Sequence, residues 1–341
     1  MGRIEELRER HSLDDAGLRE LLESEDASLR ENLSAQAREE AVERFGKGIY
    51  LRALIEWSNV CRRDCRYCGI RKSQAAVRRY TLSREEILQS CGQAWDLGVK
   101  TFVLQGGENP PAARELAATV AEIRAAWPEA AITLSLGELP FETYALLRRN
   151  GADRYLLRHE TADPSLYAAL HPGTSLDNRL ACLQELRRLG FQTGTGMMAG
   201  VPGQTVEHLI RDIRFIEAFR PEMIGIGPFI PSPGTPLGGH PAGSADLTLR
   251  LYAILRLMCP DANIPSTTAL SVLSGGGRMA GILSGANVIM PNFTPSARRD
   301  DYALYPGKGK TDISENLRRI KEELSACGYT INPVRGDYHA F

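Results

Sequence analysis

The chain has 341 residues, of which 43% are hydrophobic and 24% are charged, and its 41 Lys and Arg residues nearly balance its 42 Asp and Glu residues. This composition is that of a folded globular protein and gives no sign of disorder. A net charge of −1 provides no overall field that would draw the chain to nucleic acid or anionic lipid. No apolar run is long enough to span a bilayer, and the charged start of the chain lacks a signal-peptide core. We therefore expect a cytoplasmic protein without a nucleic-acid or membrane partner.

The first 48 residues are predicted to be helical. Leu18, Leu21 and Leu22 keep a helical period, and residues 34–45 mix alanine with charged side chains. We interpret residues 1–48 as an N-terminal helical extension that covers the domain after it.

Strand-like and helix-like segments alternate from residue 49 onwards. A capping box at Ser83 and Glu86 opens a helix that ends at Gly98. Eight strands are predicted, at residues 50–57, 101–104, 131–136, 154–158, 193–198, 223–229, 262–268 and 287–290. The later helices are predicted at residues 112–127, 141–149, 176–189, 206–219, 247–259 and 313–327.

Eight strand-helix units over about 240 residues are what a (β/α)8 TIM barrel requires, with active-site residues at the C-terminal ends of the strands. We predict this barrel over residues 49–310, followed by a C-terminal helix and tail at residues 311–341. An open doubly wound sheet is the alternative fold.

Three cysteines, Cys61, Cys65 and Cys68, lie within eight residues directly after the first predicted strand. Three thiolates can bind three irons of a 4Fe-4S cluster and leave the fourth iron open to a small chelating molecule. A structural zinc site would need a fourth ligand, usually in a second pair of cysteines, and a redox C-x-x-C motif would leave Cys61 unexplained. We favour the cluster over these two alternatives. The remaining cysteines are scattered on predicted helices or their ends and do not indicate disulfides; they are Cys91, Cys182, Cys259 and Cys327.

The C-x3-C spacing, with the aromatic Tyr67 just before the last cysteine, resembles the signature of the radical S-adenosylmethionine (SAM) superfamily. The resemblance implies a 4Fe-4S cluster and SAM as cofactors, with SAM chelating the open iron through its amino and carboxylate groups. It also implies an electron donor, because an electron from the cluster breaks a sulfur-carbon bond of SAM and leaves methionine and a 5′-deoxyadenosyl radical.

Chemical groups follow several of the other predicted strands. Gly106, Gly107 and Glu108 follow the second strand and are similar to the Gly-Gly-Glu segment that receives the SAM amino group in the superfamily, although a glycine-rich turn is also consistent with them. Glu160 follows the fourth strand and is placed to accept hydrogen bonds from ribose hydroxyls. Arg179 could pair with the SAM carboxylate, or be a solvated helix arginine.

Two further segments are interpreted through the same resemblance. Residues 194–204 resemble the glycine-rich strand that supports the methionine part of SAM, and Ile230 is expected to pack against adenine. His159 is expected to be a structural hydrogen-bonding residue, because a lone histidine is more often that than a ligand.

Arg154 and Arg158 stand four residues apart on the fourth predicted strand, so both should face the inside of the barrel. Two inward guanidiniums need anionic partners, since leaving them unpaired costs several kcal/mol. These partners could be carboxylates of the protein or the carboxylate of a substrate.

Five segments together resemble the radical-SAM maturases of FeFe-hydrogenase; they are residues 55–61, 157–161, 225–237, 287–292 and 304–308. The resemblance covers residues 49–310 and implies assembly of the hydrogenase cofactor on a small cysteine- and iron-derived substrate, with other maturation proteins as partners. It implies Arg158 and Tyr305 as catalytic residues. The substrate contacts that it implies, together with Arg154, are Thr133, Arg158, Thr268, Met290 and Tyr305.

Two other functions remain open: a biotin synthase-like radical reaction such as the mutase chemistry of methylornithine synthase, and a non-catalytic iron-sulfur carrier. Some maturases carry a second cysteine set after a Pro-Gly-Lys segment. Here no cysteine closely follows Pro306, so we expect no second cluster.

Overall fold

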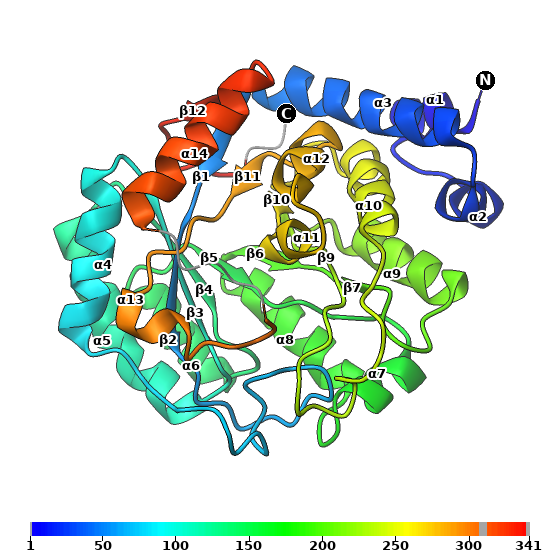
Figure 1. The fold of residues 1–341 in the computed structure, drawn as a ribbon. Coiled ribbons are helices and arrows are strands. Elements are labelled where there is room, and N and C mark those ends of the chain that lie inside the picture. The colour runs from blue at the N-terminus through cyan, green and yellow to red at the C-terminus, as the bar shows by residue number, and fades with distance from the viewer. Residues whose placement is uncertain (1, 307–311, 339–341) are drawn as a thin grey trace.

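A closed ring of parallel strands forms the centre of the computed structural model, which describes residues 2–306 and 312–338 (Figure 1). One sheet has the order β2-β3-β4-β5-β6-β8 and another the order β10-β11-β1-β12. Because β1 and β2 follow each other in the chain and a parallel bridge joins Met223 to Asn263, the two sheets close on each other. The strands are β1 (Gly48–Leu51), β2 (Ala53–Ser58), β3 (Thr101–Gly106), β4 (Ala131–Ser135), β5 (Arg154–Leu156), β6 (Gln192–Thr195), β7 (Met198–Ala199), β8 (Met223–Ile224), β9 (Gly227–Pro228), β10 (Pro265–Ser266), β11 (Val288–Ile289) and β12 (Thr330–Asn332).

Helices surround the ring (Figure 1). The predicted (β/α)8 barrel is therefore confirmed, and the alternative prediction of an open doubly wound sheet is wrong. The predicted capping box is present, since the Ser83 hydroxyl accepts from the Glu86 amide and the Glu86 carboxylate accepts from the Ser83 amide. The helices that follow the first barrel strands are α4 (Arg84–Asp96), α5 (Pro110–Ala126), α6 (Phe141–Arg149), α7 (Pro164–Leu170), α8 (Leu176–Arg188), α9 (Val206–Phe219), α10 (Ala245–Met258), α11 (Thr268–Leu273), α12 (Gly277–Leu283), α13 (Ser296–Arg299) and α14 (Ile313–Ala326).

The hydrophobic core lies mainly between the strands and the helices. Phe102, Leu104, Ile132 and Leu134 alternate along β3 and β4 and belong to this core. The residues between them face the inside of the barrel, where polar side chains such as Thr133 are buried. The inside of the barrel therefore contains buried polar side chains.

The fifth and sixth predicted strands are each broken into two short pieces. β6 and β7 are separated at Gly196, and β8 and β9 are separated at Gly225. A Cβ atom at Gly196 would overlap the carbonyl oxygen of Gly225, so the two chains approach at a distance that only glycine allows. The breaks lie next to the segment that carries Arg158 and Glu160.

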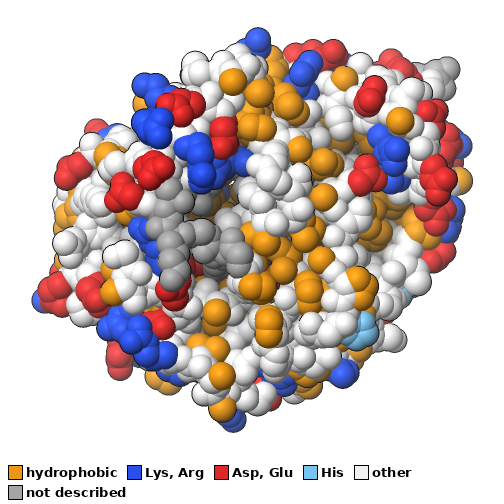
Figure 2. Space-filling model, in the orientation of Figure 1, with side chains coloured by type: hydrophobic (Ala, Val, Ile, Leu, Met, Phe, Trp, Pro, Cys, Tyr) orange, Lys and Arg blue, Asp and Glu red, His pale blue; other side chains and the backbone are white. Residues whose placement is uncertain are grey.

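The N-terminal segment forms three helices, α1 (Arg3–Arg10), α2 (Asp15–Glu23) and α3 (Ala27–Phe45), as predicted. They pack against α9 and α10 on the outside of the barrel (Figure 1). On the face drawn in Figure 2, charged side chains of both signs lie mostly toward the edge, and hydrophobic and uncharged groups occupy the middle. No helix in residues 2–306 or 312–338 is both long and apolar enough to cross a membrane.

The C-terminal segment contributes more than the predicted helix. After α14, β12 pairs in parallel with β1, and the tail beyond it enters the barrel. The carbonyl oxygen of Arg335 accepts hydrogen bonds from Thr101 Oγ1 at 2.8 Å and from Arg154 Nη2 at 2.9 Å. The predicted boundary between barrel and tail, at residues 310 and 311, lies outside the described residues, as do residues 307 and 308 of the maturase-like segment.

The prediction that Arg154 binds substrate is wrong. Arg154 is fully buried, and its Nη2 atom pairs with Asp337 Oδ1 of the tail at 2.6 Å. Arg154 lies at the start of β5 and Arg158 lies two residues beyond its end, so the two side chains lie at different depths in the barrel. Arg154 therefore lies at the closed base, where a carboxylate of the protein neutralises it.

Candidate active site

The three predicted cysteine ligands lie on one loop at the C-terminal end of β2. Cys61, Cys65 and Cys68 are all partly exposed. Cys61 Sγ accepts backbone hydrogen bonds from Arg63 at 3.4 Å and from Glu108 at 3.3 Å. Backbone N–H groups directed at a thiolate are typical of iron-sulfur sites.

The glycines after β3 allow this loop to approach. A Cβ atom at Gly107 would lie 2.5 Å from the carbonyl oxygen of Val60, and one at Gly106 would overlap the Trp57 indole. The resemblance implies that these glycines lie beside the SAM amino group. In the structure they also let two protein segments meet, so that Glu108 lies beside Cys61.

The thiols are electrostatically coupled. Burial raises the pKa of Cys65, and the neighbouring Cys68 and Cys61 raise it further, while the guanidinium of Arg179 opposes them. Three thiolates this close need positive charge between them, which iron ions would supply. Within the described part of the chain, no three His, Cys, Asp or Glu side chains converge on one point as a single metal ion would require. In a 4Fe-4S cluster each thiolate binds a different iron, so such convergence is not needed.

Carboxylates and guanidiniums alternate beneath the cysteine loop. Glu108 Oε1 accepts from Arg62 Nε at 2.8 Å and from Arg63 Nε, and Glu108 Oε2 accepts from the backbone N–H of Glu138 at 2.8 Å. Glu138 Oε2 accepts from Arg63 Nη2 at 2.8 Å, and Glu138 Oε1 accepts from Arg179 Nε at 2.7 Å. The network therefore fixes Arg179 relative to the cysteine loop.

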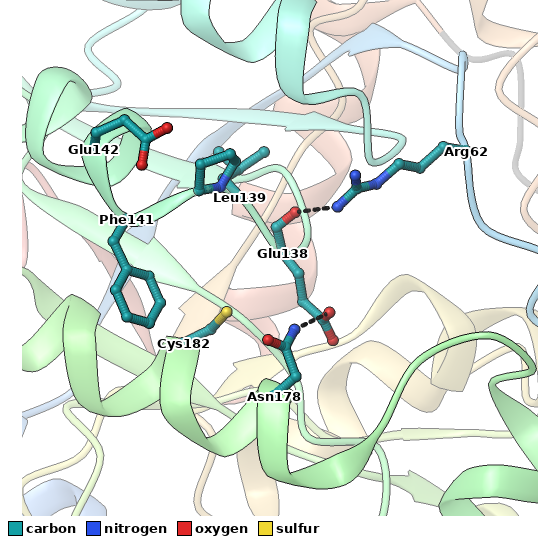
Figure 3. A pocket seen from close by; sticks show the side chains of 8 residues that line it. Arg62, Glu138, Leu139, Phe141, Glu142, Asn178 and Cys182 are labelled. Atoms are coloured by element: carbon teal, nitrogen blue, oxygen red, sulfur yellow. Dashed lines mark hydrogen bonds between the residues drawn. The ribbon is translucent and has the colours of Figure 1, made fainter.

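Glu138 was not predicted as a site residue. It is only 1% exposed, and Asn178 Nδ2 also donates to it at 2.6 Å (Figure 3). Although burial raises the pKa of Glu138, Arg179 and Arg63 outweigh that effect and hold the pKa below its ordinary value. A sequence signal existed, because Glu138 stands just after β4, at the same edge as the cysteines.

A pocket of about 410 Å³ lies on one side of Glu138, and Figure 3 shows Arg62 reaching the Glu138 backbone from across it. None of the predicted SAM residues lines it. The pocket therefore differs from the predicted cofactor site; its lining residues are Arg62, Glu138, Leu139, Pro140, Phe141, Glu142, Asn178 and Cys182.

The segment after β5 carries Arg158 and Glu160, and it holds Glu160 in an unusual backbone conformation. Glu160 has a φ angle of 66°, which is uncommon for a residue other than glycine, and its amide donates to the Gly196 carbonyl at 3.0 Å. Glu160 Oε2 forms an ion pair with Arg158 Nη2 at 3.1 Å. His159 between them is fully buried, with Nδ1 3.0 Å from Thr195 Oγ1, as expected for a structural histidine.

Several buried polar atoms near the mouth and inside of the barrel have no hydrogen-bond partner among the described residues. They are Thr133 Oγ1, Arg158 Nε and His171 Nε2. Since buried polar groups in native proteins are nearly always hydrogen-bonded, these atoms indicate a polar ligand. The residues present therefore fit a bound cofactor and a polar substrate.

Tyr67 and His171 lie next to the cysteines. Tyr67 packs against the small hydrophobic cluster of Leu166 and Phe229, and burial together with the Glu160 carboxylate holds its pKa well above the ordinary value. His171 was not predicted as a site residue; its Nδ1 atom lies 3.3 Å from Cys65 Sγ. Burial and the nearby Arg179 hold the pKa of His171 well below its ordinary value.

The remaining predicted residues are distributed around the barrel mouth. Ile230 is buried just after β9, and Tyr305 lies within electrostatic range of Arg158. Met290 follows β11, and Thr268 is exposed at the first turn of α11. No described contact joins Thr268 to Thr133.

The match of residues 55–216 to the radical SAM superfamily model agrees with this barrel and its cysteine loop. The chain is 46% identical over 292 residues to the [FeFe] hydrogenase maturase subunit HydE of Thermotoga maritima, covering 85% of this chain and 83% of that protein. It is 29% identical to 3-methylornithine synthase of Methanosarcina barkeri, covering 92% and 88% of the two chains.

Solved structures give the same fold. The crystal structure of methylornithine synthase (PylB) matches with a TM-score of 0.87 and 26% identity, over 97% of both chains. That of the [FeFe]-hydrogenase maturase HydG matches with a TM-score of 0.79 and 22% identity, over 96% of this chain and 74% of that chain.

The barrel and its cysteine loop are those of a radical SAM enzyme, a class that implies a 4Fe-4S cluster and SAM. Within that superfamily, the chain belongs to the HydE family of [FeFe]-hydrogenase maturases.

Proposed function

We propose that this enzyme acts in assembly of the [FeFe]-hydrogenase cofactor, on a small substrate derived from cysteine and iron. The observation that carries the proposal is the partly buried Arg158, whose buried Nε atom has no partner among the described residues, in a barrel where the Thr133 hydroxyl is also without one. A cationic, hydrogen-bonding interior suits the carboxylate of an amino-acid substrate. The HydE relative supplies the link to hydrogenase maturation.

Cys61, Cys65 and Cys68 would hold the 4Fe-4S cluster, with SAM on the fourth iron. When bound, the cluster and SAM supply a 5′-deoxyadenosyl radical by reductive cleavage of SAM. The protein holds these groups in place and excludes water.

The SAM ligands would come from three sides of the mouth. Gly106, Gly107 and Glu108 would meet the amino group, and Glu160 would accept from the ribose. Arg179 would bind the SAM carboxylate, while its Nε atom donates to Glu138. Tyr67 and Ile230 would pack against the nucleoside.

Replacing Glu160 or Arg179 with alanine is expected to weaken SAM binding at least tenfold. Loss of one charge-assisted hydrogen bond costs about 1.5–3 kcal/mol, and about 1.4 kcal/mol is tenfold in Kd. Calorimetry on cluster-loaded protein measures this. Arg188→Ala is the matched control, because Arg188 is on the same helix but pairs with Glu185 at the surface. Wild-type affinity in both Glu160→Ala and Arg179→Ala would contradict the assignment.

The substrate would lie inside the barrel. Arg158 and Tyr305 are proposed as catalytic residues, and Thr133, Thr268 and Met290 as further substrate contacts. Arg154 is not included, because Asp337 already neutralises it.

A second candidate function is a carbon-skeleton mutase reaction. It is favoured by the similarity to methylornithine synthase, whose structure superimposes over 97% of this chain. A non-catalytic iron-sulfur carrier accounts less well for the unpartnered polar atoms inside the barrel.

One anaerobic experiment separates these functions. The reconstituted protein is incubated with SAM, dithionite and cysteine-bound iron, and the products are separated by mass spectrometry. We expect an adenosyl-sulfur adduct, with free cysteine as the control substrate. SAM cleavage without such an adduct would favour the mutase, and no SAM cleavage at all would favour the carrier.

The remaining assignments are also proposals. The N-terminal extension of residues 1–48 and the C-terminal part of residues 311–341 would serve as covers for the barrel. We propose a cytoplasmic location, an electron donor that reduces the cluster, and contacts with other hydrogenase maturation proteins.

A further inference from the structure

His171 lies beside the cysteine loop without belonging to any motif found in the sequence. It follows the last residue of α7, is 1% exposed, and places its Nδ1 atom 3.3 Å from Cys65 Sγ. This distance is within the range of a hydrogen bond to sulfur.

The ring is held rigidly in this position. It stacks on Tyr167 with 4.5 Å between ring centroids and an interplanar angle of 21°, and it meets Tyr67 edge-on at 5.5 Å. Its own amide donates to the Tyr167 carbonyl at 2.9 Å. A contact that depends on this many neighbours is a fixed feature of the site.

The cysteine loop is tied to the same helix end. The amide of Arg66, the residue after Cys65, donates to the carbonyl of Leu170, the residue before His171, at 3.0 Å. This backbone hydrogen bond therefore helps to hold the sulfur beside the ring.

The chemistry of an iron-bound sulfur determines which atom donates. A thiolate ligand carries no proton, so the short contact is favourable only if His171 Nδ1 carries the hydrogen and donates it to Cys65 Sγ. Hydrogen bonds to cluster sulfurs stabilise the more negative, reduced state and are among the factors that set the reduction potential.

We propose that His171 is a positioning residue that donates a hydrogen bond to the cluster ligand Cys65 and thereby raises the reduction potential of the cluster. The inference rests on the proposed cluster. It concerns how readily the cluster accepts the electron that SAM cleavage needs.

Three variants test it in the reconstituted holoprotein. His171→Phe keeps a ring between the two tyrosines but has no donor. His171→Asn can place its amide nitrogen where Nδ1 lies, and His171→Gln can place its amide nitrogen where Nε2 lies. Midpoint potentials are measured by redox titration with electron paramagnetic resonance, and iron and sulfide are determined for each protein.

We expect the equilibrium constant for reduction to fall about tenfold in His171→Phe, which is about 59 mV toward more negative potential for one electron. His171→Gln should behave in the same way, and His171→Asn should recover most of the wild-type value. Equal potentials in all four cluster-loaded proteins would overturn the proposal, and so would recovery by Gln but not by Asn.

A second readout does not depend on the potential. In protein labelled with ¹⁵N-histidine, electron-nuclear double resonance of the reduced cluster should detect a coupled nitrogen that disappears in His171→Phe. Its absence from the wild-type protein would overturn the hydrogen bond. A wild-type protein that binds no iron-sulfur cluster would instead refute the cluster itself, so the two failures are distinguishable.

Discussion

Replacing Cys61, Cys65 or Cys68 with alanine is expected to abolish the 4Fe-4S cluster and, with it, all SAM cleavage. Each thiolate would hold a different iron, so no remaining ligand can substitute for the lost one. The other four cysteines lie on helices or at helix ends, so none belongs to this loop. Iron and sulfide analysis, visible absorption and the yield of methionine from SAM measure the loss.

Cys327→Ala is the matched control for this prediction. Cys327 is an exposed cysteine at the C-terminal end of α14, and its loss should leave iron, sulfide and SAM cleavage unchanged. The expectation of a single cluster would be contradicted if the wild-type protein held more iron and sulfide than one cluster contains and if Cys327→Ala lost this excess.

Replacing Arg158 with leucine is expected to remove hydrogenase maturation while the cluster is retained. Arg158 Nη2 donates to the Met197 carbonyl at 2.5 Å and pairs with Glu160, but its buried Nε atom has no partner among the described residues. If that atom meets the substrate carboxylate, a leucine there leaves the carboxylate buried and unpaired. Such an uncompensated buried charge costs about 3–5 kcal/mol, which is more than two orders of magnitude in binding.

The measurement is activation of apo-hydrogenase by the variant together with the other maturation proteins. SAM affinity must be measured in parallel, because Arg158 also contacts Glu160. Arg158→Lys serves as the comparison, since it keeps the charge but loses the planar fork, and it should keep partial activity. Activation at the wild-type rate by Arg158→Leu would show that the anionic pocket is elsewhere.

Two residues that the sequence did not single out take a central place in the site. Glu138 joins Arg63 of the cysteine loop to Arg179 of α8, and His171 lies against Cys65. Neither belongs to a spaced motif, because Glu138 and His171 meet Glu108 and Cys65 across 30 and 106 residues of chain, respectively. Only the position of Glu138 just after β4 hinted at a role, and α7, which precedes His171, was not predicted.

Arg154, by contrast, was predicted as a site residue, but the structure places it outside the site. Alternation along a strand correctly placed Arg154 and Arg158 on one face, yet it carries no information about which end of the barrel each residue occupies or what covers that end. The partner of Arg154 is Asp337, 183 residues later in the chain, in a tail whose entry into the barrel base had no sequence signal. β12, which leads into that tail, was missed for the same reason.

The sequence by itself determined the barrel and the cysteine loop, because both are written in local patterns. Hydrophobic alternation and capping residues specify strands and helices, and three thiols within eight residues predict a shared metal centre wherever the loop lies. Tertiary structure alone decided the charge pairing: Glu108 with Arg62 and Arg63, Glu138 with Arg179, and Asp337 with Arg154. Ion pairs between distant segments depend on how the strands close into a ring, and closure is a property of the whole chain rather than of any one stretch.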